Sequence, residues 1–89
     1  MTVVWQAAAL ADIRRILGYI TTENPAAARR IARELMLAGD SLELFPQRGR
    51  TGLVPGTREL AAVRPYILVY EAEGDSVCIL RVWHSAQDR

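Results

Sequence analysis

The residues of this chain best suited to chemistry lie near its carboxy terminus. His84 is the only histidine, and imidazole is the side chain best suited to proton transfer near neutral pH. Arg81 lies shortly before it, and a guanidinium binds phosphate or carboxylate oxygens in pairs. Each residue also has a structural interpretation. Arg81 could pair with Glu59 or Glu71 on a neighbouring strand, and His84 could be a surface or packing residue at the end of a strand.

The basic residues are uniform in type and uneven in position. Eleven residues are basic and all are arginine, since the sequence has no lysine, and the formal net charge is only +1. A base-composition bias of the genome would explain this choice, but arginine also suits planar contacts to phosphate or carboxylate. Six of them fall in the second half of the chain: Arg48, Arg50, Arg58, Arg64, Arg81 and Arg89. A net charge near zero is therefore compatible with a local basic patch on the surface.

Several kinds of site are not expected from the composition. One cysteine and one histidine do not provide a metal-ligand set, and no glycine-rich phosphate motif leads from a strand into a helix. We therefore expect no metal and no cofactor. Cys78 is expected to be a small core residue. The amino terminus has neither a basic region nor a long apolar stretch, so we expect no signal peptide, no membrane span and a cytoplasmic location.

Hydrophobic spacing predicts the elements of the first half. Residues 3–5 are a short strand candidate. Apolar residues then recur at helical spacing and predict a helix over about residues 8–22, with Asp12 off the apolar stripe. Asn24 precedes Pro25, which is a typical start of a helix, here over about residues 26–44. Gly39 is expected to loosen that helix, and the short connection predicts an antiparallel helical hairpin.

The second half changes to strand periodicity. After a turn-rich segment at residues 45–57, strands are predicted at residues 58–63, 66–70 and 77–83, joined as an antiparallel meander. We therefore predict one α+β domain over residues 1–89, of order β-α-α-β-β-β, with the helical hairpin on one face of a small, mainly antiparallel sheet. On the last strand, alternation assigns one set to the helix-facing side: Cys78, Leu80 and Val82. It assigns the other set to the uncovered side: Val77, Ile79, Arg81 and Trp83.

The ordered set of segments resembles the RelE/ParE toxin family of type II toxin–antitoxin systems, and its ParE-like members in particular. The loop and second strand at residues 49–60, the strand at residues 66–70 and the last strand and tail at residues 79–89 are similar to those of ParE-like toxins. The alanine-rich first helix and the Asn24-Pro25 start of the second agree with this. The resemblance covers nearly the whole chain.

The resemblance implies the compact fold of that family and a ParD-like antitoxin partner, with which the chain would form a hetero-oligomer. It implies DNA gyrase as the target for ParE-like members, and mRNA on the ribosome for RelE-like members. We expect a non-enzymatic gyrase inhibitor whose contacts to the target come from Arg81, Trp83, His84 and Arg89. Trp83 could instead fill the core edge beside Trp5, since the family pattern places their strands side by side.

The alternative is a ribosome-dependent mRNA endonuclease. Arg58, Arg81 and His84 would then hold the scissile phosphate and move protons, with a carboxylate such as Glu59. RNA-cleaving relatives carry several lysines, which this chain lacks, and arginine is a poor proton donor. A third interpretation is a module that only titrates an antitoxin. We also expect the isolated chain to aggregate or self-associate, because a small domain would expose an apolar groove.

Overall fold

The computed structural model describes residues 1–86 of the 89-residue chain, so Arg89 lies outside the described residues. The elements follow in this order: β1 (Thr2–Trp5), α1 (Ala7–Glu23), α2 (Pro25–Asp40), the 3-10 helix η1 (Ser41–Glu43), β2 (Arg50–Thr51), β3 (Arg58–Val63), β4 (Tyr66–Glu73) and β5 (Ser76–His84). The predicted α+β order is confirmed, and the two-residue strand β2 is added to it.

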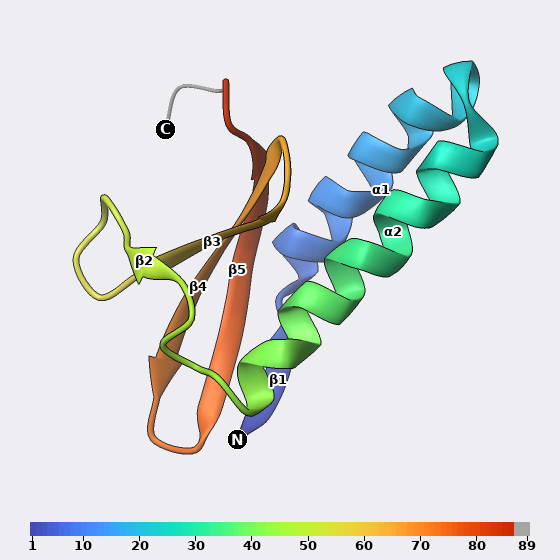
Figure 1. Ribbon diagram of the computed structural model, residues 1–89. Helices are drawn as coiled ribbons and strands as arrows, with labels where there is room; N and C mark the ends of the chain where they lie inside the picture. Colours follow the sequence, from blue (N-terminus) through green and yellow to red (C-terminus); the bar gives the residue numbers. More distant parts are fainter. Residues whose placement is uncertain (87–89) are drawn as a thin grey trace.

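The strands form one sheet in the order β1-β5-β4-β3-β2 (Figure 1). β3, β4 and β5 pair antiparallel as the predicted meander, and β2 pairs antiparallel with β3. β1 is the exception, because it pairs parallel with β5. The first strand of the chain therefore lies beside the last one, which confirms that the strands of Trp5 and Trp83 are neighbours. Within that pair, however, Trp5 lies opposite Ile79.

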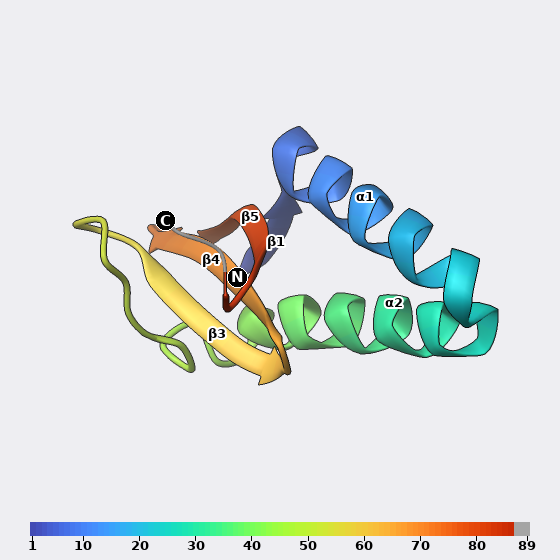
Figure 2. The same ribbon diagram turned by 90° about the horizontal axis from the view of Figure 1, so that it is seen from above.

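The helical hairpin lies on one side of the sheet (Figure 2). Its second helix starts as predicted: the Asn24 side chain accepts a hydrogen bond from the Ala27 N–H at 3.1 Å, and Pro25 occupies the first turn. α2 ends earlier than predicted, at Asp40, where the Ser41 hydroxyl donates to the Ala38 carbonyl at 2.6 Å and the chain tightens into η1. Serine hydroxyls commonly bind nearby backbone groups in this way, and the bond replaces one that a continuing helix would make.

Gly39 does not loosen α2, contrary to the expectation. The helix runs through it to Asp40. A side chain at this position would overlap the ring of Trp5 and the end of Ile79. The glycine therefore permits close packing of α2 on β1 and β5, at the modest local cost in helix propensity that glycine carries.

A bulge in β5 corrects the predicted faces of that strand. Val69 pairs with Arg81 and Tyr70 pairs with Ile79, so Leu80 is an extra residue opposite β4. One extra residue reverses the alternation, and the residues packed in the core are therefore Val77, Ile79 and Val82. Cys78 and Leu80 are only half-buried, so the prediction that they face the helices is wrong, whereas that of Val82 is right.

The core lies between the sheet and the hairpin. The two helices pack on each other, and on the sheet α1 contacts mainly β5 and α2 mainly β3. The largest buried side chains are Tyr70, Leu35, Leu42 and Leu68. Within residues 1–86, no helix is long and apolar enough to cross a membrane.

Candidate functional site

Arg81 is bound to α1. Its Nε donates to Asp12 Oδ2 at 2.7 Å and its Nη2 donates to Asp12 Oδ1 at 3.0 Å. The Val82 N–H also donates to Asp12 Oδ2, at 2.9 Å, and Arg15 Nη2 lies 3.1 Å from Asp12 Oδ1. Asp12 is 1% exposed. Its carboxylate therefore joins helix and sheet through a two-point arginine pair and a backbone hydrogen bond, which is a strong arrangement.

This arrangement corrects the sequence-based placement of Arg81. Its partner is Asp12 on α1, and not Glu59 or Glu71 on a neighbouring strand. β1 ends at Trp5, opposite Ile79, so the next residues of β5 lack a strand on that side. Asp12 accepts the Val82 N–H there. Two of the guanidinium N–H directions are used inside the fold, and only part of the side chain stays exposed.

The charges of this pair stabilise each other. Burial by itself raises the pKa of Asp12, but the hydrogen bonds from Arg81 and Val82 and the positive charge of Arg81 outweigh burial, so the pKa lies below its usual value. The hydrogen bond to Asp12 in turn raises the pKa of Arg81. Both groups stay ionised at neutral pH, so the Arg81 guanidinium does not release a proton and cannot act as a general acid.

Trp83 and His84 follow Arg81 at the end of β5. The Arg81 guanidinium carbon lies 5.6 Å from the Trp83 ring centre, within the range of a cation–π contact. The His84 ring meets Tyr66 edge to face at 5.7 Å, and His84 Nδ1 accepts the Ala86 N–H at 3.0 Å. His84 and Tyr66 also line a hollow of about 370 Å³ against α1, together with Arg15, Ile16, Tyr19 and Ile20.

Arg58 belongs to a different part of the molecule. Its Nη1 donates to the Gly49 carbonyl at 2.8 Å. The Tyr70 hydroxyl accepts from the Gly49 N–H and donates to the Pro46 carbonyl. Arg58 lies opposite Tyr70, whereas His84 lies opposite Tyr66, which separates their rows by about 13 Å along β4. Arg58 and His84, two of the proposed ribonuclease residues, therefore lie on separate rows of the sheet, whereas Arg81 lies three residues before His84 on β5.

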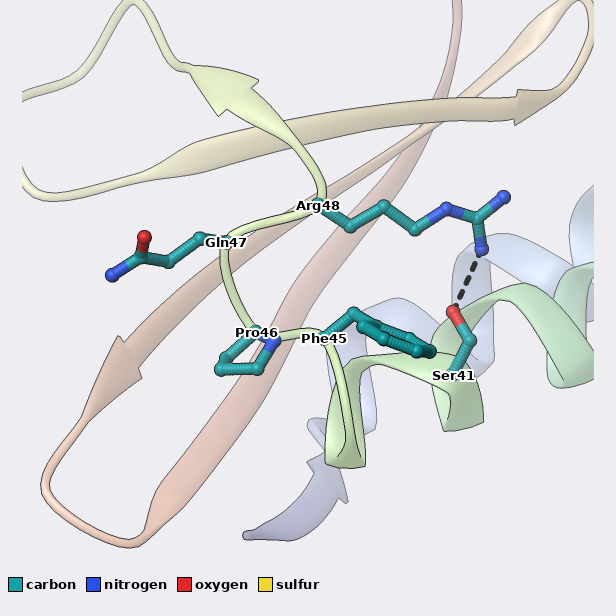
Figure 3. Close-up of a pocket in the computed structure, with 5 residues that line it drawn as sticks. All are labelled: Ser41, Phe45, Pro46, Gln47 and Arg48. Carbon is teal, nitrogen blue, oxygen red and sulfur yellow. Dashed lines mark hydrogen bonds between the residues drawn. The ribbon is translucent and has the colours of Figure 1, made fainter.

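A larger hollow, of about 570 Å³, lies between η1 and the following loop (Figure 3). It is lined by Ser41, Phe45, Pro46, Gln47 and Arg48. Arg48 Nη1 donates to the Ser41 hydroxyl at 2.8 Å, as the dashed line in Figure 3 marks. None of the lining side chains is a carboxylate or a histidine, so the hollow offers no proton-transfer group.

Asp12 is the residue that sequence reasoning missed. It was placed off the apolar stripe, yet Ala9, Asp12, Ile13 and Ile16 share one helical face, and the first three are buried. An acidic residue inside an apolar stripe requires a partner, because an unpaired buried charge is costly. That signal was available in the sequence. For metals, residues 1–86 contain no group of three or more His, Cys, Asp or Glu able to hold an ion.

Comparisons with known proteins agree with this fold. The family described as the ParE toxin of the type II toxin–antitoxin system parDE matches residues 3–89. Toxin RelE2 of Caulobacter vibrioides is 42% identical, over 96% of both chains. Toxin RelE1 of the same organism is 34% identical, over 99% of this chain and 97% of its own.

A solved structure described as the chromosomal ParDE toxin–antitoxin system of P. aeruginosa superposes with a TM-score of 0.85. It is 25% identical and covers 94% of this chain and 95% of the matched chain. Sequence and structure thus agree over nearly the full length, and the chain belongs to the ParE toxin family of type II toxin–antitoxin systems.

Proposed function

We propose that this toxin acts by inhibiting DNA gyrase and that a ParD-like antitoxin neutralises it. The observation that carries the proposal is the Asp12–Arg81 pair. The arginine that would hold a scissile phosphate is already bound, in two-point geometry, to a buried carboxylate. The ParE family match supports the same target class. A toxin that acts by contact needs a rigid surface and no proton-transfer group.

Target contact is assigned to the end of β5. Trp83 and the exposed part of Arg81 form one cation–π pair, and His84 follows directly. Arg89 belongs to the same proposal but lies outside the described residues. Tryptophan and arginine side chains carry most of the binding energy in many protein interfaces. Because Arg81 also holds the fold together, Trp83 is the better residue for testing contact.

A ribosome-dependent mRNA endonuclease is the second candidate. Two relatives are named RelE toxins. In addition, His84, Tyr66 and Arg15 line one hollow, which combines a proton-transfer group with a cation. In this alternative His84 would be the catalytic residue, while Arg58 and Arg81 would contribute only through their present structural contacts.

The antitoxin partner follows from the family. The similar solved structure is a ParDE toxin–antitoxin system, and we propose that a ParD-like segment lies along the helical hairpin and the sheet edge. If the chain were only a module that titrates an antitoxin, its expression without the antitoxin would leave growth unchanged. We expect growth arrest, measured as colony formation after induction.

The deciding experiment incubates the purified toxin with gyrase and relaxed plasmid, beside a translating-ribosome cleavage assay. We expect loss of supercoiling or trapped cleaved DNA, with intact mRNA. Trp83→Ala should weaken gyrase inhibition by at least tenfold, in keeping with the loss of an interface tryptophan. The mRNA should stay intact with the wild type and with His84→Ala alike. Cut mRNA with normal supercoiling, abolished by His84→Ala, would establish the endonuclease instead.

A further inference from the structure

The connection between β2 and β3 is a closed turn held by its own hydrogen bonds. At its neck the Gly52 N–H donates to the Thr57 carbonyl at 2.8 Å. Inside it, the N–H and the hydroxyl of Thr57 both donate to the Val54 carbonyl, at 3.1 and 2.6 Å. Gly56 has a φ of 86°, a conformation that glycine adopts without strain. The shape of residues 52–57 is therefore set by the chain itself.

A buried carboxylate braces the base of this turn. Glu59 is 6% exposed and accepts hydrogen bonds from Arg50 Nη2 at 3.2 Å and from the Leu53 N–H at 3.4 Å. In the sheet register Glu59 lies opposite Val69, which lies opposite Arg81. Residues directly opposite one another share a face of the sheet. The turn is thus attached to the same face as Arg81.

This rigid turn displays two large apolar side chains to solvent. Leu53 is 72% exposed and Val54 is 63% exposed. In both ribbon views the turn projects beyond the sheet, on the side away from the helices (Figures 1 and 2). Because the turn is already ordered, binding through these side chains would lose little conformational entropy. Burial of these two adjacent apolar side chains by a partner would be favourable, because it removes their apolar surface from water.

The surroundings of the turn carry positive charge. Between residues 44 and 70 the only acidic residue is Glu59, which is paired, whereas four arginines occur there: Arg48, Arg50, Arg58 and Arg64. The Arg50 side chain is 71% exposed. Arg50 and Arg64 also line a hollow of about 370 Å³ with Ala61 and Pro65. A partner that covers the turn must therefore combine an apolar pocket with carboxylates at its rim.

We propose that the turn at residues 52–57 is a docking element for the protein target, with Leu53 and Val54 in an apolar pocket of gyrase and Arg50 and Arg64 against carboxylates around it. The inference rests on the proposed function, because it assigns this turn to the target-contact face that also carries Arg81 and Trp83. It adds a second contact region, at the opposite edge of the meander from β5.

The test compares two matched double variants. Leu53→Ser/Val54→Ser removes the apolar tip. Leu44→Ser/Phe45→Ser alters an adjacent pair of similar exposure, 77% and 62%, outside the turn. We expect the first variant to weaken gyrase binding by at least about 30-fold, because two buried apolar side chains are lost from the contact, and to lose growth arrest at equal expression. The second variant should match the wild type in both assays. Thermal unfolding of each variant checks that the fold is retained.

The outcomes separate this inference from the proposed function. A wild-type toxin that ignores gyrase overturns the proposed function, whatever the variants do. A tip variant that arrests growth and binds gyrase like the wild type overturns the docking element, and so does one that loses only antitoxin binding. Thr57→Val keeps the apolar tip but removes the hydroxyl bond to Val54. It should weaken gyrase binding about three- to tenfold through lost preorganisation, with the exposed Thr51→Val as its control.

Discussion

The molecule has two buried carboxylates that each accept hydrogen bonds from one arginine and one backbone N–H. Asp12 lies on α1 beside β5, and Glu59 lies on β3, at the other edge of the meander. Asp12 accepts from Arg81 and from the Val82 N–H, and Glu59 accepts from Arg50 and from the Leu53 N–H. The Asp12 bonds measure 2.7 and 2.9 Å, whereas the Glu59 bonds measure 3.2 and 3.4 Å. The donors to Asp12 in these bonds lie 69 and 70 positions away from it in the sequence. The donors to Glu59 lie only nine and six positions away.

This difference separates a contact that holds the fold together from one that shapes a loop. Among the described residues, helix α1 is joined to strand β5 by hydrogen bonds that end on the Asp12 carboxylate, from the Arg81 side chain and the Val82 N–H, and they are lost without it. Without Glu59, β3 keeps its pairing with β4, and the neighbouring turn loses the acceptor of the Leu53 N–H. It follows that loss of toxicity in an Arg81 variant reports on folding as much as on target contact.

The largest effect is expected for Asp12→Ala. It leaves the buried Val82 N–H without its acceptor and the partly exposed Arg81 guanidinium without its partner, and an unsatisfied buried donor costs about 1–3 kcal/mol. The total stability of a chain this size is of the order of 4–13 kcal/mol, so the variant should lose a substantial share of its stability. The free energy of unfolding is measured by urea titration followed by circular dichroism.

Two companion variants sharpen this prediction. Glu23→Ala removes an exposed carboxylate from the same helix and should change stability by less than about 0.5 kcal/mol. Adding Arg81→Met to Asp12→Ala should cost little more, because its partner is already gone, so the two changes should be strongly non-additive. Additive losses would show that Asp12 and Arg81 stabilise the fold through separate contacts.

The sequence predicted the elements well, because each depends on local signals. Asn24-Pro25 marked the start of α2, and the strands from residue 58 onward followed a period of two with turns between them. The bulge at Leu80 could not be read in this way. Residues 77–80 and 82 are all apolar or cysteine. Either assignment of alternate residues to the core face would therefore bury apolar side chains, so the sequence does not indicate that one residue is inserted here.

The site was predicted less well, because its key contacts are distant in the chain. Arg81 was recognised as an anion-binding residue, which is its chemistry, but the anion is Asp12 of the same chain. The turn at residues 52–57 was predicted as turn-rich, but the exposure of Leu53 and Val54 depends on how Thr57 and Glu59 hold it. Composition alone gives no such arrangement.

Acidification should reduce the contribution of Asp12 to the free energy of unfolding. Because the pKa of Asp12 in the folded chain lies below its usual value, its carboxylate stabilises the fold above the unfolded-state pKa of about 3.9. That contribution declines as the pH falls from there through the folded-state pKa. Urea titrations from pH 7 to pH 2.5 should show this loss in the wild type. Asp12→Asn should be less stable at pH 7 and show a shallower decline, and parallel curves would contradict the assignment.

Of the two buried carboxylates, Glu59 is expected to have the smaller effect on stability, tested by Glu59→Gln. The amide keeps an acceptor oxygen for the Leu53 N–H but removes the charge that faces Arg50, and a pair with one exposed partner contributes about 0–1 kcal/mol. Unfolding by urea should therefore change by less than about 1 kcal/mol, less than for Asp12→Ala. Gyrase binding should still weaken severalfold, because the turn loses its brace. If Glu59→Gln instead destabilised the chain as strongly as Asp12→Ala, both carboxylates would hold the fold together, and the turn would be part of the folded core instead of a projection that it supports.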